Sequence, residues 1–208
     1  MKQSAEKNFL GLLSTPENLE VGQSGLLSWF AENGRKDIPW KLKDDGNSPK
    51  NGELLLPYGI WIAEVMLQQT QFNVALPYWK KWMEVFPTLL DLGKASESKV
   101  LLLWQGLGYY SRARRILQAA EQLLDLIGDG DPLDPVAWPN DLETWISLPG
   151  VGRSTGASII SSAFDLPAAL LDGNVKRVLG RIFAISQPAA NSLPELWAIS
   201  EKLIDRQN

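Results

Sequence analysis

The sequence predicts an all-α protein, a bundle of many helices. Apolar residues recur at spacings of three and four residues along much of the chain, which is the period of a helix that buries one face. No pair of segments stands out with the two-residue alternation of half-buried strands. Prolines stand near the starts of the periodic segments or in the loops that separate them, which are the positions that helices tolerate.

Nine segments show the helical period. In chain order they are residues 25–31, 58–69, 74–86, 98–104, 113–127, 142–148, 154–164, 175–185 and 193–204. Pro57 precedes the second segment and Pro194 lies at the start of the last, while Pro77 lies inside the third, where we expect it to mark the first turn. Residues 43–52 form a polar loop and residues 129–139 a connector rich in Pro and Asp, neither long enough to indicate a domain linker.

Composition limits the chemistry that the chain can perform. Its 45% apolar and 21% charged residues are ordinary for a globular protein, and no apolar run approaches the roughly 18 residues of a membrane span. With no signal peptide in the sequence, we expect a cytoplasmic protein, associated with the nucleoid if bacterial. The chain has no cysteine and no histidine, so acid–base chemistry falls to carboxylates, Lys or Tyr.

A glycine turn near residue 150 is the most informative local feature. Gly150 and Gly152 are separated by one residue and lead directly into a helical segment, so backbone N–H groups can point outward towards a phosphate oxygen. Asp172 follows after one helical segment and a loop, at the start of the next helical segment. Its carboxylate can therefore lie beside a phosphate backbone that the turn binds. Taken alone, Pro-Gly-Val-Gly would also suit a tight turn between core helices.

Several motifs in a fixed order resemble one family. They are residues 36–40 (KDIPW), 57–70 (PYGIWIAEVMLQQT), 104–114 (WQGLGYYSRAR), 148–155 (LPGVGRST) and 171–177 (LDGNVKR). Together they resemble the adenine DNA glycosylases of the MutY family, within the endonuclease III or helix-hairpin-helix superfamily. The resemblance runs from about residue 27 to the C-terminus. It implies an endonuclease III-like helical bundle that contains a helix-hairpin-helix.

The resemblance also implies a domain organisation. Residues 1–24 would be an N-terminal extension, and residues 56–168 a helical bundle with the catalytic Glu and the helix-hairpin-helix. Residues 25–55 and 169–208 would form a partial second subdomain. Because the family continues into further helices with four cysteines that bind a [4Fe-4S] cluster, we expect a C-terminally truncated protein with exposed apolar surface and no cluster.

Glu64 and Asp172 are the two candidate catalytic carboxyls. On a helix Glu64 shares a face with Ile60 and Trp61, and such apolar neighbours raise the pKa of a carboxyl, as a general acid requires. Asp172 precedes a helical segment, where an N-cap position favours the ionised form. A Glu at the rim of a buried helix and a simple helix cap are the plain alternatives. With the resemblance, the pair is expected to face one cleft and divide the work as in glycoside hydrolysis.

The resemblance assigns further roles. Adenine opposite 8-oxoguanine or guanine would be flipped out of double-stranded DNA, with Asn174 holding Asp172 and water. Gln69 would fill the gap left by the base and Tyr109 would support the stack near the opposite strand, although Gln69 could be a surface residue and Tyr109 and Tyr110 core residues. The expected DNA-binding residues are Gln69, Tyr109, Leu148, Gly150, Val151, Gly152, Arg153 and Ser154. We expect a monomer without contact to a membrane.

Ser154 distinguishes a monofunctional glycosylase from the related endonuclease III lyases. In endonuclease III lyases the position that corresponds to Ser154 carries a lysine that forms a Schiff base with the sugar, and a serine cannot do so. The sequence therefore predicts a monofunctional glycosylase, with a glycosylase/lyase as the weaker alternative.

The net charge of −4 argues mildly against binding nucleic acid, but Arg153, Lys176 and Arg177 lie beside the motifs. An inactive DNA-binding remnant and a folded remnant without DNA binding remain open as alternatives.

Overall fold

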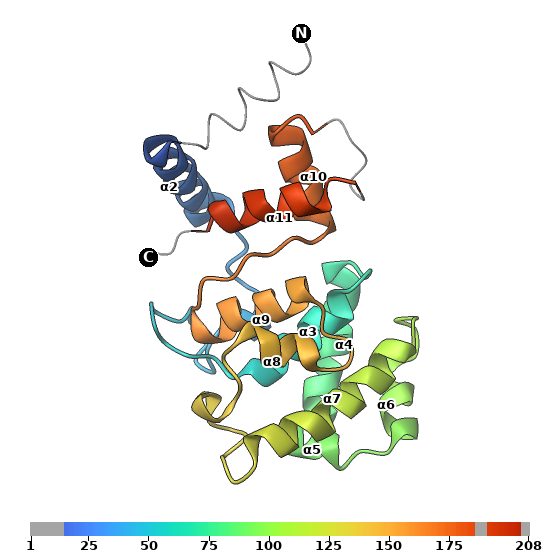
Figure 1. Ribbon diagram of the computed structural model, residues 1–208. Coiled ribbons are helices and arrows are strands. Elements are labelled where there is room, and N and C mark those ends of the chain that lie inside the picture. The colour runs from blue at the N-terminus through green and yellow to red at the C-terminus, as the bar shows by residue number, and fades with distance from the viewer. Residues whose placement is uncertain (1–14, 186–190, 205–208) are drawn as a thin grey trace. The chain divides into compact units, whose positions relative to one another are not determined.

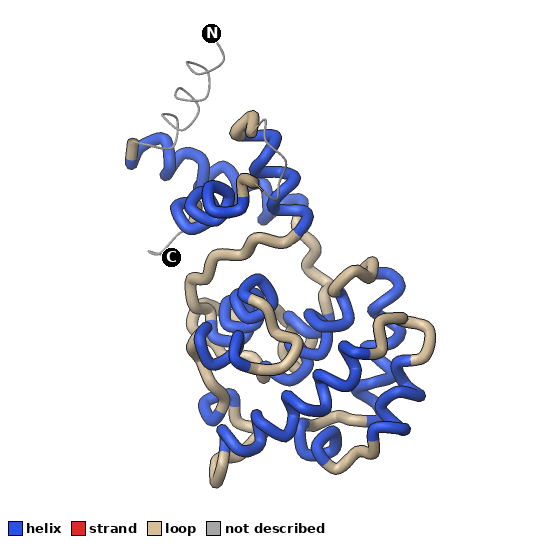
Figure 2. Tube along the Cα trace, turned by 45° about the vertical axis from the view of Figure 1, so that its right-hand side comes forward, coloured by secondary structure: helices blue, strands red, loops and turns tan. Residues whose placement is uncertain are grey.

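The computed structural model describes residues 15–185 and 191–204, and every regular element within these ranges is helical (Figure 1). No strand occurs in them (Figure 2), so the all-α prediction is confirmed. In chain order the helices are α2 (Pro16–Asn33), α3 (Pro57–Leu67), α4 (Phe72–Val85), α5 (Leu89–Gly93), α6 (Glu97–Trp104), α7 (Ser111–Ile127), α8 (Leu142–Ser147), α9 (Arg153–Phe164), α10 (Gly173–Ile182) and α11 (Leu193–Lys202). Two 3-10 turns, η1 (Pro39–Lys41) and η2 (Pro135–Ala137), lie in the loops.

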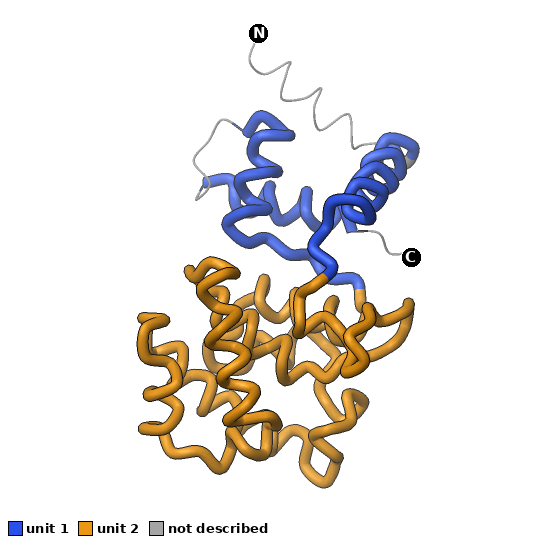
Figure 3. The backbone as a smooth tube through the Cα atoms, turned by 180° about the vertical axis from the view of Figure 1, so that it is seen from behind, with its two compact units in different colours: residues 1–36, 167–208 blue, residues 37–166 orange. Residues whose placement is uncertain are grey.

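The chain divides into two compact units, coloured separately in Figure 3. Unit 1 comprises residues 1–36 and 167–208, of which residues 1–14 lie outside the described ranges, and unit 2 comprises residues 37–166. This division differs from the expected one, which counted residues 37–55 with the second subdomain. These residues belong to unit 2 because both of their ends are anchored there: Trp40 packs against Phe72 and Trp79, and the Leu55 N–H donates to the Ala163 carbonyl at 2.8 Å.

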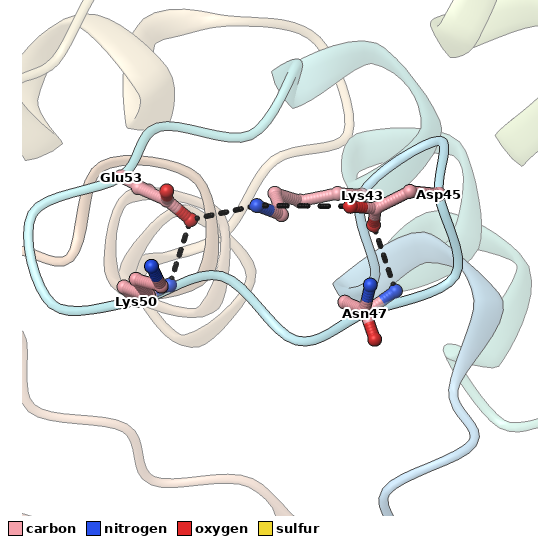
Figure 4. Close-up of polar contacts among 5 residues, drawn as sticks. All are labelled: Lys43, Asp45, Asn47, Lys50 and Glu53. Carbon is pink, nitrogen blue, oxygen red and sulfur yellow. Dashed lines mark hydrogen bonds and ion pairs between the residues drawn. The ribbon is translucent and has the colours of Figure 1, made fainter.

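The polar loop between Trp40 and Leu55 is held by its own side chains (Figure 4). Lys43 pairs with Glu53 at 3.1 Å, and the other contacts of Glu53 include the Lys50 N–H at 2.8 Å. The Asn47 N–H donates to Asp45 at 2.9 Å. Hydrogen bonding by Lys50 and Lys43 lowers the pKa of Glu53 below its usual range. The segment is therefore an ordered loop of unit 2.

Helix α3 forms the centre of unit 2. Its residues are buried on every side except at Glu64 and Leu67, and it packs against α4, α7, α9 and η1. At Gly59 a Cβ atom would lie 3.3 Å from the Trp79 ring, whose Nε1 donates to the Gly59 carbonyl at 2.8 Å, so α4 approaches α3 closely at this glycine. A helix that is apolar all round is a core helix, and a charged residue on it is exceptional.

Two helix starts and one short helix differ from the sequence-based expectation. Helix α2 begins at Pro16 rather than near residue 25, because Thr15 caps it by accepting from the Asn18 N–H. Helix α4 begins at Phe72, which places Pro77 within the helix and not in its first turn. The short helix α5 was not predicted, since its five residues are too few to show a period.

Unit 1 contains α2, α10 and α11, with a separate small core. Its buried residues are Leu171, Leu179, Phe183, Leu196 and Ile199. On α2 several large apolar side chains are more than half exposed, namely Val21, Leu26, Leu27, Trp29 and Phe30. Among the described helices, none is both long enough and apolar enough to cross a membrane.

Candidate active site

Glu64 is the one acidic residue of the central helix α3. Its side chain is half-buried, and its neighbours one turn earlier, Ile60 and Trp61, are fully buried. The hydroxyl of Ser158, a buried residue of α9, donates to Glu64 Oε1 at 2.8 Å. A single carboxyl thus lies at the edge of an aromatic core, with one oxygen oriented by a neighbouring helix, which is an arrangement suited to proton transfer.

The segment that follows α3 turns sharply. Gln68 is the C-cap residue, and Gln69 has a left-handed backbone with φ of 59° and an exposed side chain. The Gln68 amide reaches the hairpin turn, where Nε2 donates to the Gly150 carbonyl at 3.1 Å and to Thr155 Oγ1 at 3.2 Å. The end of α3 and the glycine turn are therefore joined directly.

Tyr109 lies in the loop between α6 and α7. Its side chain is 65% exposed and its φ is 48°, and the next residue, Tyr110, is 41% exposed. The alternative that these tyrosines belong to the core is therefore wrong. Two non-glycine residues with left-handed backbones, Gln69 and Tyr109, are thus both exposed, and strained exposed residues are typical of binding surfaces.

The helix-hairpin-helix consists of α8, the turn at residues 148–152, and α9. Gly150 has a φ of 82°, and Gly152 is the N-cap residue of α9. Leu148 and Val151 are buried, and the Val151 N–H donates to the Leu148 carbonyl at 3.2 Å. These two residues therefore shape the turn from within. Gly152 and Arg153 are exposed and Ser154 is half-buried, so the outer surface of the turn is made by the start of α9.

Asp172 lies in unit 1 as the N-cap residue of α10, as expected. Its Oδ1 accepts from the Val175 N–H at 2.8 Å, and its Oδ2 accepts from Asn174 Nδ2 at 3.3 Å. Both oxygens of the Asp172 carboxyl thus accept hydrogen bonds at the N-terminal end of α10, which is the positive end of the helix dipole. Asn174 is exposed and contacts Asp172, which is the position that the sequence analysis gave it.

Two residues of the site were not identified from the sequence. Ser158 lies 94 residues from Glu64 in the chain, and Arg112 is a buried arginine whose Nη1 donates to the Val65 carbonyl 47 residues earlier. Serine within a helix and arginine within a basic run carry no local signal for such contacts. Only the packing of α9 and α7 against α3 reveals them.

The side chains present do not fit an iron–sulfur cluster. The 208 residues contain no cysteine, and within the described ranges no three His, Cys, Asp or Glu side chains gather closely enough to hold a metal ion.

Comparison with known families agrees with this geometry. Residues 62–200 match the family described as HhH-GPD superfamily base excision DNA repair protein. The chain belongs to this superfamily. The matched region includes Glu64, the hairpin turn and Asp172.

Curated relatives of this superfamily member are adenine DNA glycosylases. The protein of Mus musculus is 38% identical over 199 residues, covering 93% of this chain and 36% of its own length. That of Buchnera aphidicola (subsp. Baizongia pistaciae) is 40% identical over 161 residues, covering 77% of this chain and 41% of its own length. The chain thus spans well under half the length of these relatives.

Solved structures support the fold. A thermostable thymine-DNA glycosylase has a TM-score of 0.70 at 23% identity, with 91% of this chain and 79% of that chain covered. An endonuclease III trapped as a covalent intermediate with DNA has a TM-score of 0.63 at 22% identity, with 91% and 84% covered. At these identities the likeness establishes the shared helical fold alone, and the endonuclease III-like class is confirmed.

Proposed function

We propose that this chain is the catalytic part of a DNA repair glycosylase that hydrolyses the N-glycosidic bond of adenine mispaired with 8-oxoguanine or guanine. The observation that carries the proposal is the Glu64 carboxyl on the otherwise apolar helix α3, oriented by Ser158. The 38–40% identity to adenine DNA glycosylases supports adenine as the base.

The proposed mechanism uses two carboxyls in different states. The enzyme flips adenine out of the duplex, and Glu64 donates a proton to a ring nitrogen of the base. The bond between sugar C1′ and the base then breaks, and its electron pair leaves with adenine. Asp172, the N-cap residue of α10, stabilises or captures the sugar cation until water attacks C1′ and loses a proton to solvent, and Asn174 holds Asp172 and the water.

The proposed DNA contacts come from three exposed segments of unit 2. Gln69 fills the space that the flipped base leaves, and Tyr109 supports the base stack near the opposite strand. The hairpin turn, with Gly150, Gly152 and Arg153, binds the phosphate backbone. Leu148 and Val151 act in this proposal by shaping the turn, because their side chains are buried. The protein binds double-stranded DNA as a monomer and acts where the genome is, in the cytoplasm or at a nucleoid.

Ser154 supports hydrolysis without strand cleavage. A serine at this position cannot form an imine with the sugar, so the product is an abasic site in an intact strand. A glycosylase/lyase would need another amine.

A glycosylase assay on the purified chain tests the proposal. We expect it to release adenine from a duplex with one A:8-oxoguanine pair, with strand breaks seen only after alkali. Glu64→Gln removes the donated proton and should lower the rate by about 100-fold or more, while duplex affinity is kept. Release at the parental rate by Glu64→Gln, or breaks without alkali, would contradict the mechanism.

A second candidate function is DNA binding without catalysis. It is favoured by the absence of cysteine from these 208 residues, because the family's [4Fe-4S] cluster is held by four cysteines. A module that binds DNA without turnover would show salt-dependent duplex binding and no base release by the parental chain. The same assay, run beside a binding titration, separates the two functions.

A further inference from the structure

Three segments of unit 2 carry the residues proposed to contact DNA. They are residues 68–70 after α3, residues 105–110 between α6 and α7, and residues 148–152 in the hairpin. Each lies in a turn outside the helices, where backbone geometry is not maintained by helical hydrogen bonds. Two buried or half-buried side chains, Arg112 and Gln68, connect all three segments.

The Arg112 guanidinium joins two of these segments with separate nitrogens. Nη1 donates to carbonyls at the end of α3, at 3.0 Å to Val65 and 3.1 Å to Met66, and also to the Gln68 carbonyl. Nη2 donates to the carbonyls of Leu107 at 3.1 Å and Gly108 at 3.3 Å. The planar fork of an arginine fixes the distance between these two sets of acceptors, which a single ammonium group cannot do.

The bonded carbonyls lie immediately before the two strained residues. Gln68 precedes Gln69, which has a φ of 59°, and Gly108 precedes Tyr109, which has a φ of 48°. A left-handed backbone is unfavourable for a residue with a side chain and persists only where the surroundings enforce it. Because Arg112 binds the peptide group that enters each of these residues, it is positioned to enforce both conformations.

The third segment is joined through Gln68. While its carbonyl accepts from Arg112, its side chain donates to the Gly150 carbonyl and to Thr155 Oγ1. At Gly150 a Cβ atom would lie 3.1 Å from the Arg115 side chain, so α7 also limits the hairpin turn. The glycine turn is therefore linked to the Gln69 segment by one residue.

The charge of Arg112 is balanced by dipoles and rings. Its side chain is buried, and burial lowers the pKa of its guanidinium below the usual value. Carbonyls at the C-terminal end of α3 carry the negative end of the helix dipole, and the guanidinium also lies over the rings of Trp104 at 5.2 Å and Tyr109 at 5.6 Å. The ring of Tyr109 is thus held by the same group that holds its backbone.

We propose that Arg112 and Gln68 form a positioning junction that holds the three segments in one arrangement, so that Gln69, Tyr109 and the hairpin engage a duplex together. The role of the segments in binding DNA rests on the proposed function. The junction itself is a property of the free protein and can be measured without DNA.

Hydrogen exchange of the free 208-residue chain is the first test. Arg112→Lys keeps the charge but loses one arm of the fork, and we expect amide exchange in residues 68–70 and 107–110 to rise together by about tenfold or more. Gln68→Ala should raise exchange in residues 149–152. Arg114→Lys is the matched control on α7, since Arg114 is exposed and pairs with the Glu97 carboxylate at 2.8 Å, and it should leave all three segments unchanged.

Unchanged exchange in the Arg112→Lys protein, or a rise in only one of the two segments, would overturn the junction. A uniform rise over all helices with a lower melting temperature would assign Arg112 to general stability, and would also overturn it.

A double-mutant cycle in the Glu64→Gln background is the second test. Gln69→Ala and Tyr109→Ala should weaken duplex binding non-additively when Arg112 is present and additively in the Arg112→Lys protein. If the coupling free energy between Gln69→Ala and Tyr109→Ala in duplex binding is the same with Arg112 and with Lys at this position, Arg112 does not position the two residues jointly. If the parental chain releases no adenine while exchange responds as expected, the proposed function fails and the junction stands.

Discussion

The hydroxyl of Ser158 on α9 donates to the carboxyl of Glu64, the one acidic residue of α3. A hydrogen bond to a carboxyl fixes which of its oxygens faces the neighbouring helix. Because Ser158 is buried, its hydroxyl needs a hydrogen-bond partner within the protein. The hydrogen bond from Ser158 therefore sets the orientation from which Glu64 can donate a proton.

Ser158→Ala is expected to slow adenine release under single-turnover conditions. Loss of a hydrogen bond to an ionisable group costs about 1–2 kcal/mol, which corresponds to roughly a 5- to 30-fold lower rate. Duplex affinity and melting temperature should change little. Ser161→Ala, on the exposed side of the same helix, is the control. A rate equal to that of the parent would show that Ser158 does not orient Glu64.

Residues whose chemistry is local could be predicted from the sequence. Asp172 was expected at the start of a helix, because Asp followed by Gly-Asn and a helical period indicates an N-cap, and it is one. Burial of Leu148 and Val151 could not be predicted, because a turn motif does not state which of its side chains point into the core. The contacts of Arg112 could not be predicted either, since only the fold brings its side chain to carbonyls 44 to 47 residues away.

At the level of the elements, the hairpin depends on close contact between α8 and α9. At Gly156 a Cβ atom would lie 3.0 Å from a Leu142 methyl and 3.3 Å from Trp145 Cβ, so the two helices approach at a residue without a side chain. Helix α8 is short, and its N-cap is Asp141, whose Oδ1 accepts from the Thr144 N–H at 2.8 Å. A helix of six residues has little stability of its own, so its cap is important.

Replacement of Asp141 by Asn should make the stability of the protein less dependent on pH. Hydrogen bonds from the backbone and side chain of Thr144 lower the pKa of Asp141 in the folded protein. A lowered pKa adds stability above the unfolded value, near pH 4, which is lost as the pH falls through the folded value. Asn caps a helix without titrating.

Urea unfolding of the parent and the Asp141→Asn variant between about pH 7 and pH 2.5 measures this effect. The free energy of unfolding of the parent, relative to the variant, should decline on acidification. Asp141→Ala should be less stable than both at pH 7, by about 1 kcal/mol. If the difference in free energy of unfolding between the parent and the Asp141→Asn variant stays constant below about pH 4, the pKa of Asp141 is not lowered in the folded protein.

For the whole molecule, the two units have separate cores of unequal size. Unit 2 buries many large aromatic residues around α3, among them Trp61, Trp82, Trp104 and Trp145. Among the described residues of unit 1, five form a buried hydrophobic core, and large side chains of α2 are exposed. Since stability grows with buried apolar area, the two units should differ in their resistance to denaturant.

Equilibrium unfolding in urea should therefore depart from two-state behaviour. Trp29 and Trp197 lie in unit 1 and the other seven tryptophans in unit 2, so replacing these two by Phe yields a protein whose fluorescence reports unit 2 alone. We expect its fluorescence transition at higher urea than the first loss of helical circular dichroism. Coincident transitions by both probes would show that the units unfold together.

The sequence alone determined the helical class, the hairpin, the candidate carboxyls and the similarity to base excision glycosylases, because helical periods, glycine turns and caps act over a few residues. The tertiary structure decided which unit takes residues 37–55, which side chains of the hairpin turn are buried, and that Ser158 and Arg112 contact α3. Those outcomes depend on helices that pack against α3 from distant parts of the chain, and no local pattern encodes such contacts.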